Sequence, residues 1–112
     1  MSERIPFSDF QKLDLRVGTI VDVQNHPKAD KLYVLKVDFG ESELRTIVAG
    51  LRSHYTHEQL KDRQAIFVTN LEPVNLRGVE SNGMILAASN EEKTDVFFLR
   101  PEKQIKAGSK VH

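Results

Sequence analysis

The chain of 112 residues contains no cysteine and no tryptophan, and its formal net charge is zero. Without cysteine it can form no disulfide and has no cysteine nucleophile. Sixteen basic residues balance sixteen acidic ones, whereas a nucleic-acid-binding domain usually has a basic excess. If this chain binds nucleic acid, the charge balance predicts weak binding with a small salt dependence.

Long apolar runs are also missing, since no stretch approaches the length needed to span a membrane. The first residues, Met-Ser-Glu-Arg-Ile-Pro, lack the apolar segment of a secretory signal. We therefore expect a cytoplasmic protein with no membrane association. Hydrophobic residues at 39% and charged residues at 29% are typical of one globular domain over residues 1–112.

Alternating apolar and polar residues predict three strands in the first half of the chain. We expect them over residues 13–23, 33–39 and 44–50, with the last two joined as a hairpin. In the first strand Leu13 is expected to point inward, and Gly18 is expected to mark a bulge or a bend.

After Gly50 the periodicity changes. Thr56 and Gln59 have the spacing of a capping box, which predicts a short helix from His57 to about Lys61. His54 then lies outside that helix, so we expect no metal site at this pair of histidines.

Two apolar runs, residues 65–68 and 84–88, are expected to be buried strands. The loop between them contains Pro73, Gly78 and Gly83, which favour turns. It also carries the polar side chains Asn70, Asn75, Arg77, Ser81 and Asn82. Amides, a hydroxyl and a guanidinium can bind phosphate, ribose or base edges, although long surface loops often contain such residues.

Five strands with one short helix between the third and fourth match the order of an OB-fold barrel. The pattern alone leaves other small β folds open. Residues 91–112 extend beyond the expected core of about residues 8–90. Phe97 and Phe98 in this extension need a cover, either from the same chain or from a second copy.

Several motifs resemble the tRNA-binding domain family, which includes C-terminal domains of methionyl-tRNA synthetases, free-standing tRNA-binding proteins and the chaperone CsaA. They are Asp9-Phe10-Gln-Lys-Leu-Asp-Leu-Arg-Val-Gly-Thr-Ile, His26-Pro-Lys-Ala-Asp-Lys-Leu, Asn70-Leu-x-Pro, Arg77-Gly-Val and Ser81-x-Gly-Met. The resemblance implies an all-β OB-fold barrel with a C-terminal extension that helps form a homodimer. It also implies a non-catalytic module that binds tRNA by shape more than by sequence, as an auxiliary of methionyl-tRNA synthetase.

Carried onto this sequence, the resemblance and the basic strand residues give a candidate tRNA-binding set: Arg16, Lys31, Lys36, Arg45, Asn70, Arg77, Ser81 and Met84. The residues themselves leave plainer roles open, because surface arginines often pair with carboxylates and surface lysines are often only solvated. Glu72 and Asn75 stand where relatives frequently carry Lys or Arg, so two loop cations are missing.

The main alternative is a peptide-binding role like that of CsaA, with a dimer groove lined by Met84, Phe97 or Phe98. An enzyme is not expected, because the sequence shows no phosphate-binding loop, no nucleophile motif and no metal cluster. We expect no cofactor.

Overall fold

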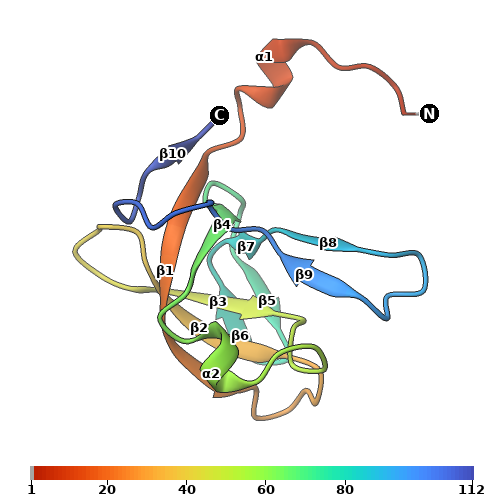
Figure 1. Ribbon diagram of the computed structural model, residues 1–112, viewed down its shortest axis with the longest axis vertical. Coiled ribbons are helices and arrows are strands. Elements are labelled where there is room, and N and C mark those ends of the chain that lie inside the picture. The colour runs from red at the N-terminus through yellow and green to blue at the C-terminus, as the bar shows by residue number, and fades with distance from the viewer. Residues whose placement is uncertain (1) are drawn as a thin grey trace.

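The computed structural model describes residues 2–112 and shows a small all-β protein built around one barrel (Figure 1). The main sheet has the order β3-β2-β1-β4-β7 and all its pairs are antiparallel. Its strands are β1 (Leu15–Asn25), β2 (Tyr33–Asp38), β3 (Arg45–Ala49), β4 (Gln64–Val68) and β7 (Met84–Ile85). The short helix α2 (His57–Leu60) lies between β3 and β4, which confirms the predicted order of elements.

Two hydrogen bonds bring the free edge of β3 against the segment before β7 and nearly close the barrel. The amide of Asn82 donates to the Thr46 carbonyl over 2.8 Å. The amide of Val48 donates to the Ser81 hydroxyl over 2.9 Å. The predicted five-stranded OB-fold barrel is therefore confirmed.

The barrel interior follows the predicted alternation, with Leu35, Val37 and Phe67 fully buried. Leu13 is an exception, because β1 begins two residues later and leaves this side chain 40% exposed. The prediction of a bulge at Gly18 is also wrong, since the register with β2 shifts between Ile20 and Asp22.

Gly18 has a packing role instead. A Cβ atom at this position would lie 2.5 Å from Val37 and 2.6 Å from Phe39. Only glycine lets β1 pass so close to these two core side chains.

Helix α2 begins at the predicted capping box. The Gln59 amide donates to the Thr56 hydroxyl, and the Thr56 amide donates back to the Gln59 side chain. Leu60 is fully buried, so the helix contributes one apolar side chain to the core.

The apolar run 84–88 was expected to be one buried strand, and this prediction is wrong. After Ile85 the chain leaves the barrel, so that β8 (Ala87–Ser89) pairs instead with β9 (Val96–Phe98) in a projecting hairpin (Figure 1). Both alanines of this run are exposed. The end of the strand is set by pairing with distant strands, and the apolar run itself does not indicate where that pairing stops.

The loop before β7 also contains structure that the sequence reading missed. It folds into a second hairpin of β5 (Val74–Leu76) and β6 (Val79–Ser81). Arg77 and Gly78 form its two-residue turn, with φ of 55° and 97°. Positive φ at both turn positions is the geometry of a type I′ hairpin turn.

The C-terminal extension folds back on the barrel. Its last strand, β10 (Lys110–Val111), pairs with the start of β1, and the Ile66 amide donates to the Leu99 carbonyl. Phe98 packs edge-on against Tyr55 with ring centroids 5.1 Å apart. Phe97 remains 61% exposed, so the chain itself covers only one of the two phenylalanines.

The N-terminal segment projects from the same end of β1, near β10, and carries the single-turn helix α1 (Phe7–Phe10) (Figure 1). No residue of α1 is buried, and Phe7 is 69% exposed. Neither described helix is long and apolar enough to cross a membrane.

Candidate nucleic-acid interface

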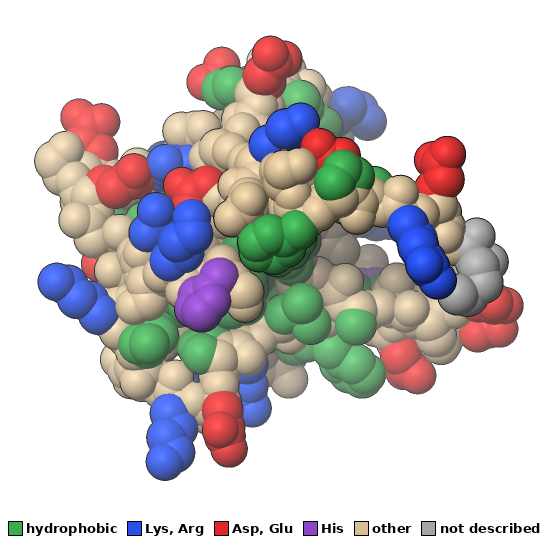
Figure 2. Space-filling model, turned by 90° about the horizontal axis from the view of Figure 1, so that it is seen from above, with side chains coloured by type: hydrophobic (Ala, Val, Ile, Leu, Met, Phe, Trp, Pro, Cys, Tyr) green, Lys and Arg blue, Asp and Glu red, His purple; other side chains and the backbone are tan. Residues whose placement is uncertain are grey.

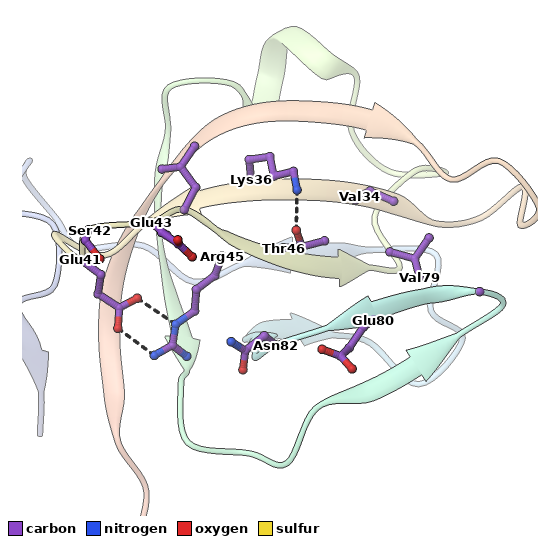
Figure 3. Close-up of a pocket in the computed structure, with 12 residues that line it drawn as sticks. Val34, Lys36, Glu41, Ser42, Glu43, Arg45, Thr46, Val79, Glu80 and Asn82 are labelled. Carbon is purple, nitrogen blue, oxygen red and sulfur yellow. Dashed lines mark hydrogen bonds and ion pairs between the residues drawn. The ribbon is translucent and has the colours of Figure 1, made fainter.

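A groove of about 770 Å³ runs between the β2–β3 turn and the β5–β6 hairpin (Figure 3). Residues of β2 and β3 form its floor, and the hairpin forms the opposite wall. We call this the binding groove; its lining side chains are Val34, Lys36, Glu41, Ser42, Glu43, Leu44, Arg45, Thr46, Val79, Glu80 and Asn82, with Gly78. The curved outer face of a small barrel is a common place for OB folds to bind oligonucleotides.

The two cations of the binding groove are already engaged within the protein. Arg45 makes a bidentate pair with Glu41 at 2.9 and 3.0 Å and donates to the Thr69 carbonyl at 2.7 Å. Its guanidinium also lies 5.3 Å from the centre of the Phe39 ring. Lys36 donates to the Thr46 hydroxyl (Figure 3). Neither cation is therefore as free for phosphate as the sequence suggested.

Carboxylates outnumber cations in the same groove. Glu43 and Glu80 are exposed, and no side chain among residues 2–112 pairs with either of them. In Figure 3 Glu80 and Asn82 lie side by side and face the space in front of Arg45. The groove thus presents acceptors and an amide more than positive charge.

Free cations gather instead at one end of the groove. His26, only 3% exposed, contacts the Leu76 carbonyl through Nε2 at 2.8 Å, while its Nδ1 accepts from the Lys28 amide at 3.0 Å. These bonds hold the loop after β1 against the β5–β6 hairpin. The result is a set that we call the cationic end: Lys28, Lys31, Arg52 and Arg77.

Lys28, Lys31 and Arg77 are exposed, and no described side chain accepts a hydrogen bond from them. Arg52 reaches the Ala29 carbonyl at 3.4 Å, which places it beside the same loop. Asp30 is the one carboxylate in that loop. This end of the molecule is therefore locally basic although the whole chain is neutral.

Arg16 is separated from this end of the molecule. Its side chain bonds Asp14 at 2.8 Å and the Gly108 carbonyl at 3.2 Å. Desolvation acts to raise the pKa of Asp14, but the hydrogen bond and charge of Arg16, with the charge of Lys110, bring the pKa below its ordinary value. Arg16 is therefore engaged in an ion pair with a carboxylate, which is the plainer role that the sequence left open.

Two motif residues serve the scaffold. The Asn70 side chain accepts from the Asp14 amide at 2.8 Å and donates to the Lys12 carbonyl at 2.6 Å, which fixes the chain entering β1. Ser81 is 5% exposed and its hydroxyl also donates to the Gly83 carbonyl at 3.0 Å. Both side chains make their hydrogen bonds within the protein. Their role is therefore to hold the surrounding backbone in place more than to contact a ligand.

Met84 is 46% exposed on β7 but does not line the binding groove. Sequence reasoning missed His26 and Glu80, whereas Asn82 was already expected among the polar side chains of the loop. The burial of His26 could not be predicted from the alternation of apolar residues, because its hydrogen-bond partner is a carbonyl 50 residues away. Glu80 would have been expected at the surface had the hairpin at Arg77-Gly78 been identified.

A nearly closed five-stranded barrel with a polar groove and a basic end defines the class of protein as an OB-fold domain. Comparison with known proteins makes this specific. Residues 15–110 match the family model described as "Putative tRNA binding domain". The chain belongs to the tRNA-binding domain family.

Its relatives include the methionine–tRNA ligases of Pyrococcus furiosus, 56% identical over 107 residues, and of Pyrococcus horikoshii, 55% identical over 109 residues. These matches cover 96% and 97% of this chain but only 14% and 15% of the ligases. The chain therefore spans about one seventh of the length of the curated relatives it matches.

Solved structures give the same fold. A methionyl-tRNA synthetase-related protein from Pyrococcus horikoshii superposes with a TM-score of 0.91 at 33% identity, covering 99% of this chain and 100% of the other. The chaperone CsaA from Bacillus anthracis superposes with a TM-score of 0.87 at 30% identity, covering 98% of this chain and 100% of that chain.

Proposed function

We propose that this chain is a non-catalytic, structure-specific tRNA-binding module that acts in the cytoplasm as an auxiliary to methionyl-tRNA synthetase. The observation that supports this best is the cationic end beside the binding groove in a chain of the tRNA-binding family. Phosphate contacts position a protein on folded RNA without reading its sequence. The cationic end supplies such contacts from a loop and a hairpin tip and not from a stripe along one strand, as expected for recognition by shape.

Lys31 and Arg77 are the predicted site residues that remain best placed for phosphate. Lys31 lies in the loop held by His26, and Arg77 forms the tip of the β5–β6 hairpin. Lys36 and Arg45 stay in the proposed site as residues that line the groove, and Ser81 as one that braces its hairpin wall. Asn70 and Met84 do not line the groove, and for them an RNA contact stays a prediction. Arg16 would contact RNA only if the RNA reached the opposite end of β1.

The test is the salt dependence of tRNA binding in the double variant Lys31→Ala with Arg77→Ala. Each lost phosphate contact lowers the slope of log K against log salt by roughly 0.7–0.9. We expect a slope smaller by about 1.4–1.8 units, with weaker binding at low salt. The matched control, Arg100→Ala with Lys103→Ala, removes the same charge from the C-terminal extension. Equal effects of the two double variants would contradict the assignment to the cationic end.

We further propose that the chain forms a homodimer through the N-terminal segment and the C-terminal extension. Ile5, Phe7 and Phe10 are exposed around α1, and Phe97 is exposed on the extension. Figure 2 looks at the face that carries α1 and the chain ends, and hydrophobic side chains gather there beside a hollow. An apolar set of this size on a small protein favours association.

Mass measurement by light scattering tests the dimer. The wild-type chain is expected at twice its 12.8 kDa mass, and Phe7→Ser with Phe10→Ser at 12.8 kDa. The exposed Leu44 lies in the binding groove, so Leu44→Ser is the control and should leave the dimer intact. A monomeric wild type at working concentration would refute this part of the proposal.

Peptide binding is the second candidate, because the CsaA chaperone shares the fold and because Met84 and Phe97 are exposed. Phe98, however, is half-buried against Tyr55, which removes one of the three residues expected to line a peptide groove. The family match favours tRNA.

A further inference from the structure

The binding groove is poorly suited to phosphate. Arg45 uses its donors on Glu41 and Thr69, and Lys36 bonds Thr46. The carboxylates of Glu43 and Glu80 line the same space. A phosphate placed in this open groove would meet two carboxylates unpaired within residues 2–112, Glu43 and Glu80, against the single charge of Lys36, which is unfavourable.

The same groove offers what a nucleobase requires. Val34 and Val79 provide an apolar wall at one end, and the volume of about 770 Å³ is ample for one base and its ribose. Glu80 supplies carboxylate oxygens that accept hydrogen bonds, and the Asn82 amide can both donate and accept. Bases of folded RNA that are unpaired expose these donors and acceptors on their Watson–Crick edges.

We infer that the binding groove takes one unpaired base of the RNA, held by hydrogen bonds to the Glu80 carboxylate and the Asn82 amide. Guanine fits best, because its ring N–H and its amino group point the same way and can donate together to one carboxylate. Uracil has a single ring N–H flanked by two carbonyl acceptors, which the carboxylate would repel. The inference rests on the proposed function and adds the chemistry that the groove recognises.

The cationic end and the binding groove have different roles because their charges differ. The cationic end holds the phosphate backbone, while the acidic groove beside it accepts the base that this strand turns inward. His26 links the two parts, because it joins the loop of Lys28 to the hairpin that carries Glu80.

The first test depends on the sign of an effect. In the variant Glu80→Gln one negative charge is removed from an RNA-binding surface. If Glu80 were only a surface carboxylate, tRNA binding would strengthen, because repulsion of phosphate falls. A carboxylate that accepts two hydrogen bonds from a base predicts the opposite, with binding weaker by about tenfold, near the lower end of what a bidentate base contact contributes.

The control is Glu91→Gln, which removes the same charge from the turn between β8 and β9, outside the groove. Thermal unfolding shows whether each variant remains folded. Stronger or unchanged binding by a folded Glu80→Gln protein would overturn the inference. If the wild type itself fails to bind tRNA, the proposed function fails, and the groove is then judged by the second test alone.

The second test uses nucleosides, which have no phosphate, and needs no tRNA. Guanosine and uridine are titrated separately at millimolar concentration while backbone amide shifts are followed by NMR. Guanosine is expected to move the amides of residues 41–46 and 78–82 in the wild type, with uridine moving them less and Glu80→Gln responding little. Equal shifts from the two nucleosides, or none, would refute base recognition. So would shifts caused by a lysine-rich peptide but not by guanosine, which would indicate a groove for cationic peptide.

Discussion

The Ser81 hydroxyl is predicted to stabilise the closed barrel more than any other polar side chain of the β5–β6 hairpin. It accepts from the Val48 amide at 2.9 Å and donates to the Gly83 carbonyl at 3.0 Å, and the serine is almost fully buried. In Ser81→Ala the Val48 N–H loses its acceptor at the seam of the barrel. A buried donor without a partner costs about 1–3 kcal/mol.

For a chain of this length each kcal/mol corresponds to roughly 4 °C in the unfolding midpoint. Ser81→Ala should therefore lower Tm by about 4–12 °C and shift the urea midpoint without changing the slope. Both are measured at fixed protomer concentration, because dimer formation would couple stability to concentration. The control is Ser42→Ala, an exposed serine of the β2–β3 turn that lines the groove.

A loss of stability in Ser81→Ala no larger than in Ser42→Ala would refute the reasoning, since it would mean that water satisfies the Val48 amide. Binding measured far below Tm gives a second readout. Because the side chain does not face the groove, the folded variant should retain most of its affinity for tRNA.

Two further predictions concern packing and acid stability. Gly18→Ala would place a methyl group against Val37 and Phe39 and should cost about 1–3 kcal/mol through overpacking; an unchanged urea midpoint would contradict this close contact. Hydrogen bonds from Arg45 lower the pKa of Glu41, so their stabilisation is present above the ordinary carboxyl pKa and is lost as pH falls through the lowered value. Glu41→Gln should therefore lose less stability between pH 7 and about pH 3 than the wild type, and parallel losses in urea titrations at these two pH values would exclude the linkage.

Much of the barrel can be predicted from the sequence because its strands alternate strictly. Leu35 and Val37 occupy the inward positions that period-two alternation assigns to them, and Thr56 with Gln59 carries a local helix signal that needs no tertiary context. The family motifs add the order of the elements. Predictions succeed where the deciding interactions are local or periodic.

Predictions fail where distant parts of the chain decide. The run from Met84 to Ala88 is apolar throughout, yet only its first residues pair with β4, because the chain then leaves to pair with β9. The hairpin at Arg77-Gly78 escaped notice since arginine is not a typical residue for positive φ.

The candidate site was predicted only in part. Lys31 and Arg77 are predicted phosphate contacts, and both are exposed. His26 bonds the Leu76 carbonyl and so holds the loop of Lys31 against the hairpin of Arg77. Ser81 resembles a loop hydroxyl in sequence, and nothing near it reveals that its partner is the Val48 amide, 33 residues away. Charge pairing such as that of Arg45 with Glu41 also depends on side-chain packing that spacing alone does not fix.

The most direct test of the account is the affinity of the intact chain for folded total tRNA compared with the same tRNA unfolded, measured by gel shift at low and at moderate salt. A shape-reading module predicts clear preference for the folded form, with binding that weakens only modestly as salt rises because few phosphates are contacted. Equal binding of folded and unfolded tRNA, or no binding of either at low salt, would contradict the central claim.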